Sequence, residues 1–487
     1  MILTRKEKID SAESVHFFEK NKIIFSRASN VYIKENDKLE KIKVPISFYK
    51  KILSKFRIFR RLFRIDQYTI KVINSNNDLV IINNGNVYHY DGLKKKLTQT
   101  LRLRQSKQLL KDSICLTPDN ELFFGEYGSN KSRKSVPIYR SKNFGKDWEI
   151  VYEIKPGKIR HIHGCYWDNY ENKIWILTGD FKGENYLIKS DCDFKEIEWY
   201  GDGSQNWRAC NLFFTQNEIY WITDSEFQDN YLFKMNREDN VVLKTEKFPG
   251  PVWYIKELKD SHYLLGITCE NGPGSNNKFG YLYYSSNLKN WFEVSKFKKD
   301  FLPKKYFKNG VVSFSDGKQT IDNFIISGQG FKDFDGVSFQ CEIQEPIKFL
   351  KNKVFNGKYH KDSYQGHLNG VSKFKDVTEN HITNLLVKNY DDFNQDEIRT
   401  NEIILRFCEI KSKHFTASVN RAININKPLN EMLLLLFISN YLQSKDLRYL
   451  NIILKLTDIL KSNEYNNEAN QIYFKKVQDF IVRAIER

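Results

Sequence analysis

A polar turn that recurs about every 50 residues is the feature that most limits what this chain can fold into. Each turn carries Asp or Asn and lies between two stretches of strand-like composition. These turns lie near Asn36, Asp91, Asn143, Asp193, Asn236, Asn287 and Asp335. Short strands repeated with this period are typical of a propeller, in which each repeat forms one blade. We therefore predict a mainly β protein with a seven-bladed propeller, six blades being the alternative. Ordinary hairpins in another β fold are the competing interpretation.

One of these turns has a chemistry that explains its shape. It reads Ser-Lys-Asn-Phe-Gly-Lys-Asp-Trp over residues 141–148. The Ser141 and Asn143 side chains can bond the turn's own backbone, Gly145 can adopt a positive φ, and Trp148 can pack beneath the loop. The pattern resembles the Asp-box, or BNR repeat, of sialidase-like β-propellers, where it joins the third and fourth strands of a blade. Residues 190–193 with Trp199, and 285–287 with Trp291, resemble worn copies that lack the glycine.

The resemblance implies a carbohydrate-active propeller that covers roughly residues 20–345. Sialidases use three arginines, a Tyr-Glu pair and an aspartate at their site. This chain has no Arg-Ile-Pro motif and no third arginine at a matching place, so it departs from sialidases where their chemistry is carried out. Asp-boxes are structural and lie far from the site, so they do not identify a reaction.

The pattern divides the chain into four parts. Residues 1–19 form an N-terminal segment, 20–346 the propeller, 347–378 a polar linker, and 379–487 a helical domain with its clearest helices at 429–442, 447–460 and 472–485. We expect the C-terminal part to be a small helical domain or a docking bundle, because apolar residues there recur with helical spacing.

Residues 47–65 interrupt the strand pattern with a basic amphipathic helix. Its apolar positions are Phe48, Ile52, Leu53, Phe56, Phe59, Leu62 and Phe63. Its seven cations are Lys50, Lys51, Lys55, Arg57, Arg60, Arg61 and Arg64, and Ser47 is the expected N-cap. One interpretation is a membrane-surface helix that meets anionic lipid. The other, which we favour, is a helix whose apolar face packs on the propeller while its charges are solvated.

Charge and cysteine usage limit the partners and the compartment. The net charge of +17 favours polyanionic partners such as acidic glycans or lipid headgroups, although a lysine-rich genome would also produce it. Nucleic acid is the less favoured partner, because no binding motif accompanies the basic residues. The 7 cysteines form no CxxC pair. The N-terminal residues lack the apolar stretch of a secretory signal. We expect reduced thiols and a cytoplasmic protein, peripheral to the inner membrane if residues 47–65 bind lipid.

Polar residues at the ends of the inner strands are the candidate site. The predicted catalytic residues are Glu126, Tyr127, Arg160, His163 and Arg208. The predicted substrate-binding residues are His161, Asp180, Trp207, Asp224, Trp253, Tyr254 and Glu270. Arg160 and Arg208 hold equivalent places in consecutive blades, and His161 and His163 share one face of a strand by alternation. Glu126, Asp180, Asp224 and Glu270 end successive second strands, so we expect a ring of carboxylates.

Two arginine forks suit a carboxylate or phosphate ligand. We therefore expect an acidic oligo- or polysaccharide as partner, and either a hydrolase or a lyase of surface-polysaccharide metabolism or a non-catalytic glycan-binding or scaffold protein. Structural pairing among these charges is the remaining alternative. We expect no cofactor and no metal, because residues 161–163 offer only a histidine pair and no Gly-rich phosphate loop opens a helix.

Overall fold

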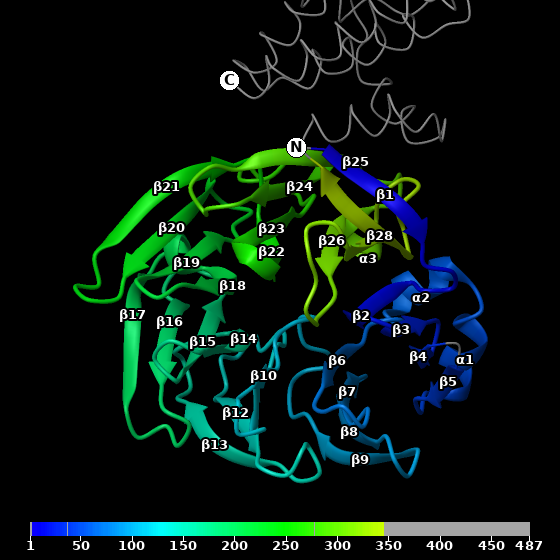
Figure 1. Cartoon of the computed structure of the whole chain (residues 1–487). Helices are drawn as coiled ribbons and strands as arrows, with labels where there is room; N and C mark the ends of the chain where they lie inside the picture. The colour runs from blue at the N-terminus through cyan, green and yellow to red at the C-terminus, as the bar shows by residue number, and fades with distance from the viewer. Residues whose placement is uncertain (1, 37, 277, 345–487) are drawn as a thin grey trace, which may run out of the picture. The chain divides into compact units, whose positions relative to one another are not determined.

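The computed structural model describes residues 2–36, 38–276 and 278–344, which form a β-propeller of seven four-stranded antiparallel sheets (Figure 1). The seven-bladed prediction is confirmed, and the six-bladed alternative is excluded. The predicted linker at 347–378 and the helical domain at 379–487 lie outside the described residues.

Blades 1 to 6 run from the central channel outward in chain order, and blade 7 does so except for its outermost strand. Blade 1 holds β2 (Ser14–Glu19), β3 (Lys22–Arg27), β4 (Asn30–Glu35) and β5 (Lys38–Lys43). Blade 2 holds β6 (Thr69–Val72), β7 (Leu79–Asn83), β8 (Asn86–Asp91) and β9 (Lys96–Arg102). Blade 3 holds β10 (Cys115–Leu116), β11 (Leu122–Gly125), β12 (Val136–Ser141) and β13 (Glu149–Ile154). Blade 4 holds β14 (His161–Asp168), β15 (Lys173–Gly179), β16 (Asn185–Ser190) and β17 (Ile197–Gly203).

The remaining blades follow the same plan. Blade 5 holds β18 (Ala209–Phe214), β19 (Glu218–Thr223), β20 (Asn230–Asn236) and β21 (Val242–Phe248). Blade 6 holds β22 (Val252–Leu258), β23 (His262–Ile267), β24 (Phe279–Ser285) and β25 (Phe292–Lys298). Blade 7 holds β26 (Val311–Phe314), β27 (Phe324–Gln329), β28 (Val337–Gln344) and, outermost, β1 (Ile2–Lys8). Short helices are α1 (Phe48–Leu53), α2 (Arg57–Phe63) and α3 (Lys304–Phe307), with 3-10 turns η1 (Gln205–Trp207) and η2 (Lys259–Ser261).

The N-terminal strand closes the ring. Blade 7 takes its outer strand, β1, from residues that the sequence analysis set apart as an N-terminal segment, so the propeller begins well before residue 20. This pairing also explains the seventh predicted turn. Asp335 lies between the second and third strands of blade 7, unlike the other six turns, because a blade that borrows its fourth strand has no third-to-fourth hairpin.

Apolar packing between neighbouring blades forms the core. Val80 and Ile82 of blade 2, for example, pack with Phe124 and Tyr139 of blade 3, all of them fully or almost fully buried. The outer strands are polar instead: β21 has exposed residues along most of its length. This division follows from the architecture, because inner strands are covered on both faces and outer strands meet water.

The Asp-box-like turn joins β12 and β13 with the predicted chemistry. Ser141 Oγ accepts the Gly145 amide at 2.8 Å, and Asn143 Oδ1 accepts the Asp147 amide at 2.9 Å. Gly145 has φ +81°, and a Cβ there would lie 2.5 Å from Val80 Cγ2, so only glycine fits. Trp148 packs on Phe124 with ring centroids 4.8 Å apart and donates to Thr100 Oγ1 at 3.1 Å.

Residues 47–65 differ from the favoured interpretation of their pattern, in which the apolar face packs on the propeller. They form two short helices, α1 and α2, and Ser47 makes no side-chain cap. Five of the seven apolar side chains of the pattern face solvent: Phe48 is 72% and Phe56 58% exposed. Leu53 and Leu62 are half-buried. Phe59 and Phe63 are exposed too, and rings of Phe56, Phe59 and Phe63 form a row. The expectation that these rings pack on the propeller is therefore wrong.

Arginines attach this insert to the propeller. Arg57 binds Asp335 through two bonds of 2.9 Å and also pairs with Asp66, while Arg60 pairs with Glu13. Arg61, only 2% exposed, pairs with Asp300 and donates to the Phe307 carbonyl at 2.8 Å. These three cations are therefore paired with carboxylates of the protein, while the aromatic rings stay in contact with solvent.

Replacing Trp148 by Ala should lower the free energy of unfolding by about 3 kcal/mol, because its ring fills space between β9 and the blade 3 core. Urea denaturation of both proteins measures this difference. Trp199→Ala is the matched control: Trp199 is 39% exposed on β17 and should cost clearly less. Equal losses for the two variants would contradict the structural role assigned to the turn.

Replacing Arg61 by Gln should destabilise the propeller by about 3 kcal/mol, because it leaves buried acceptors around the insert without their cation. Phe48→Ser should leave the thermal midpoint almost unchanged, because its ring already meets water. Scanning calorimetry compares the two. A larger loss for Phe48→Ser than for Arg61→Gln would mean that the rings, and not the arginines, hold the insert.

Candidate functional site

Most of the predicted polar residues gather on one face of the propeller. This linker face carries the segments that join consecutive blades, residues 9–13, 44–68, 103–114, 155–160, 204–208, 249–251 and 299–310. It also carries the turns between second and third strands. The Asp-box turn lies on the opposite face, because each antiparallel strand reverses direction. The linker face holds an aspartate-centred cluster and a channel pocket.

Asp180 is the centre of the cluster. His161 Nε2 lies 3.2 Å and His163 Nε2 3.0 Å from its Oδ1, and Arg160 Nη1 lies 2.7 Å from its Oδ2. Arg208 Nη2 lies 3.4 Å from Oδ1. Burial of Asp180 opposes its ionisation, but the two histidines outweigh burial and lower its pKa well below the usual value. The sequence therefore identified residues that do meet, and Asp180 connects them.

The two imidazole rings have fixed orientations. His161 Nδ1 lies 2.7 Å from the Gly128 carbonyl, and His163 Nδ1 lies 2.7 Å from the Ala209 carbonyl. Because a carbonyl oxygen only accepts, each Nδ1 carries a hydrogen. The Tyr127 ring packs 4.2 Å from the His161 ring and 5.9 Å from the His163 ring. Both Nε2 atoms consequently point at the same carboxylate oxygen.

Further carboxylates surround Arg208. Its guanidinium lies 2.6 Å from Glu226 and 3.5 Å from Asp224. Burial raises the pKa of Asp224 to about 7, with Glu270 adding to the rise and Arg208 opposing it. Burial also raises the pKa of Glu270 to about 7. Glu226 was missed by the sequence analysis, although it follows Asp224 by two residues in the same turn.

Three predicted roles need correction. Glu126 does not join the ring of carboxylates: its oxygens accept the amides of residues 104, 105 and 106 at 2.7, 2.6 and 2.9 Å and the Tyr139 hydroxyl at 2.9 Å. Trp207 stacks on Trp221 at 5.0 Å instead of lining the pocket. Arg160 and Arg208, expected to offer free forks to a ligand, are both paired with carboxylates of the chain itself.

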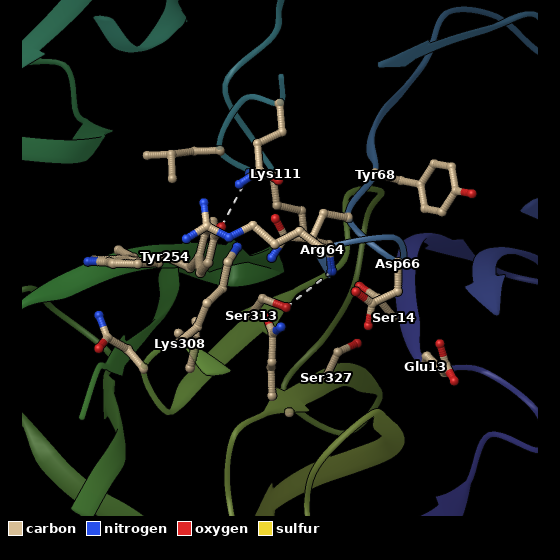
Figure 2. Close-up of a pocket in the computed structure, with 18 of the residues that line it drawn as sticks. Glu13, Ser14, Arg64, Asp66, Tyr68, Lys111, Tyr254, Lys308, Ser313 and Ser327 are labelled. Carbon is tan, nitrogen blue, oxygen red and sulfur yellow. Dashed lines mark hydrogen bonds between the residues drawn. The ribbon is translucent and has the colours of Figure 1, made fainter. Parts of the chain in front are cut away.

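A pocket of about 330 Å³ opens in the central channel (Figure 2). Three residues of the predicted site line it, Tyr127, Trp253 and Tyr254. Four charged lining residues come from segments between blades: Arg64, Asp66, Lys111 and Lys308. Sequence reasoning missed these residues because linkers carry no periodic signal that assigns a side chain to the channel.

The pocket is cationic at its wall. Within the described residues, neither Lys308 nor Arg64 has a carboxylate within ion-pair distance. Burial lowers the pKa of Lys308 to about 7, and the neighbouring Arg64 lowers it further while Asp66 opposes the shift. Burial also lowers the pKa of Lys111 to about 7 against the opposing effect of Asp112. Lys111 Nζ bonds Ser313 Oγ at 3.3 Å, as Figure 2 shows.

The two carboxylates of the pocket wall are already in use. Arg57 pairs with Asp66 and lies 3.8 Å from Glu13, which Arg60 also binds. Both carboxylates of the wall are therefore compensated by arginines of the chain itself. None of the helices in the described part of the chain has the length and apolar character that crossing a membrane requires.

Comparisons with known proteins found similar solved structures only at low sequence identity. No family model and no curated protein matches the sequence. A chain of the mitotic checkpoint complex is similar with a TM-score of 0.45 and 10% identity, covering 70% of this chain and 94% of that one. A CNH domain has a TM-score of 0.41 at 8% identity, covering 70% and 99%. An extracellular domain from B. thetaiotaomicron has a TM-score of 0.43 at 12% identity, covering 70% and 40%.

Proposed function

We propose that this propeller binds an acidic saccharide unit in its channel pocket. The observation that carries the proposal is a pair of cations, Lys308 and Arg64, that have no carboxylate partner in the part of the chain that the structure describes. Trp253 and Tyr254 line the same pocket. Cations supply the attraction for a carboxylate, and aromatic rings supply apolar contact for a sugar ring beside it. The pocket's volume suits one or a few sugar units rather than a long chain.

Binding is favoured over hydrolysis by the state of the acids. A glycosidase needs two carboxyl groups that flank the scissile bond and act as acid and as base or nucleophile. Glu13 and Asp66 are instead held by Arg57 and Arg60. A lyase remains the second candidate, because a lysine with a pKa near 7, such as Lys111, suits a general base.

Uronate oligosaccharides should bind the full chain more tightly as the pH falls from about 8 to about 6. Lys111 and Lys308 both gain a proton in this range, since each has a pKa of about 7, and the protonated forms attract an anion. Calorimetric titration against a neutral oligosaccharide of equal length measures the effect. An affinity that rises with pH would contradict the assignment.

Lys308→Gln should weaken uronate binding about tenfold, because it removes one charged hydrogen bond. Lys305→Gln is the matched control, since Lys305 lies in α3 three residues before Lys308, is exposed and does not line the pocket. New ultraviolet absorbance from an unsaturated uronate would show that the protein is also a lyase. Release of free sugar without that absorbance would show that it is also a hydrolase. Equal weakening in both variants, or no binding by the unmodified chain, would exclude this pocket as the site.

The exposed insert suggests a second role, contact with an anionic membrane surface. Phe48, Tyr49, Phe56 and Phe59 face solvent, and Lys51 and Lys55 beside them are exposed and have no ion-pair partner among the described residues. Aromatic rings with neighbouring cations are suited to the boundary of an anionic bilayer. This role would rest on the rings and on these lysines, because Arg57, Arg60 and Arg61 are held inside the protein.

Co-sedimentation with phosphatidylserine vesicles at low salt tests this contact. Replacing Lys51 and Lys55 by Gln should weaken vesicle binding, each cation contributing about 1 kcal/mol. Replacing Phe48 and Phe56 by Ser should also weaken it while leaving the thermal midpoint unchanged. A failure of the unmodified chain to bind vesicles would refute the membrane role. In that case, a molecular mass that rises with protein concentration would identify the exposed face of the insert as a contact between copies of the chain.

A further inference from the structure

Three potential ligand atoms converge at the centre of the Asp180 cluster. His161 Nε2, His163 Nε2 and an Asp180 carboxylate oxygen lie within 4.8 Å of one another, and all three residues are buried. The two histidines are neighbours on β14, and Asp180 follows the paired strand β15. Residues 161 and 163 alone offer only a pair, so the third donor is supplied by strand pairing rather than by sequence spacing.

The second nitrogen of each ring is arranged as in metal-binding histidines. Such histidines donate their other N–H to a carbonyl or carboxylate, which fixes the tautomer and turns the free nitrogen towards the metal. His161 does this with the Gly128 carbonyl and His163 with the Ala209 carbonyl, both at 2.7 Å. Asp180 is supported in the same way, because Arg160 holds its other oxygen at 2.7 Å.

We propose that His161, His163 and Asp180 bind one divalent transition-metal ion, with Zn²⁺ as the best-matched metal. Donors about 2.1 Å from a tetrahedral Zn²⁺ lie about 3.4 Å apart. The carboxylate oxygen lies 3.2 and 3.0 Å from the two nitrogens, so a small adjustment opens the space. Two imidazoles and one carboxylate leave a fourth position for water, as in open zinc sites.

The residues around the proposed metal site decide which nitrogen of His163 binds and how close the site lies to the channel pocket. Cys210 and Asp224 lie next to His163, but its Nδ1 already donates to Ala209, so the Nε2 side is the one that binds. The Tyr127 ring packs against both histidines and also lines the channel pocket. Only the Tyr127 side chain would therefore separate the metal from the saccharide pocket. The proposed metal binding does not depend on saccharide binding.

Zinc titration of the chelator-treated full chain, followed by calorimetry, tests the site. One equivalent of Zn²⁺ is expected, together with a higher thermal midpoint in its presence, because a ligand that binds only the folded state stabilises it. Co²⁺ in place of Zn²⁺ should give visible absorption bands typical of low coordination. His163→Asn and Asp180→Asn should each weaken binding about 100-fold or more.

His89→Asn is the matched control, since His89 is buried in blade 2 and belongs to neither group of candidate ligands. It should bind Zn²⁺ as the unmodified chain does. If His163→Asn fails to fold, the unmodified chain with and without chelator still decides the question. Failure to bind one equivalent, or a midpoint insensitive to zinc, would show that the two histidines and Asp180 form only an internal ion-pair network and would overturn the proposal.

Discussion

The pairing of β1 with β28 is the interaction on which the rest of the structure depends. A ring of blades buries apolar surface between every neighbouring pair, so each blade needs a partner on both sides, and an open ring would expose two such surfaces. Strands from the two ends of the described propeller join in blade 7 and close it. Closure also brings the segments between blades around one channel, which is how Arg64, Lys111 and Lys308 come to line one pocket.

Charge is distributed in an unusual way over the linker face. The insert at 47–65 directs its arginines towards the propeller and its aromatic rings towards solvent. Carboxylates from three separate segments, at Glu13, Asp300 and Asp335, receive these arginines, so their desolvation is compensated by several bonds at once. The Asp180 cluster follows the same rule: each cation is matched by a carboxylate or a carbonyl. Among the described residues, Lys308 and Arg64 depart from it, because neither has a carboxylate within ion-pair distance.

The repeat of polar turns predicted the blade number, because a propeller fixes both the length of a repeat and the position of its hairpins. Six turns lie between third and fourth strands, and Asp335 does not, since its blade completes itself with a strand from the other end of the chain. A local pattern cannot reveal that exchange. The amphipathic pattern at 47–65 was informative about helices but not about their orientation, because the partners of the arginines lie as far as 278 residues away.

The sequence by itself determined the repeat, the chemistry of the turn at Ser141–Trp148 and the set of polar residues that end inner strands, since these depend on contacts within one blade. Alternation along β14 placed His161 and His163 together, and equivalence between blades placed Arg160 near Arg208. Tertiary structure decided what those groups do. Glu126 became a support for a loop, Asp180 became the partner of both histidines, and the pocket took its cations from linkers. Such roles follow from which side chains meet across blades, and that depends on ring closure rather than on any local stretch of sequence.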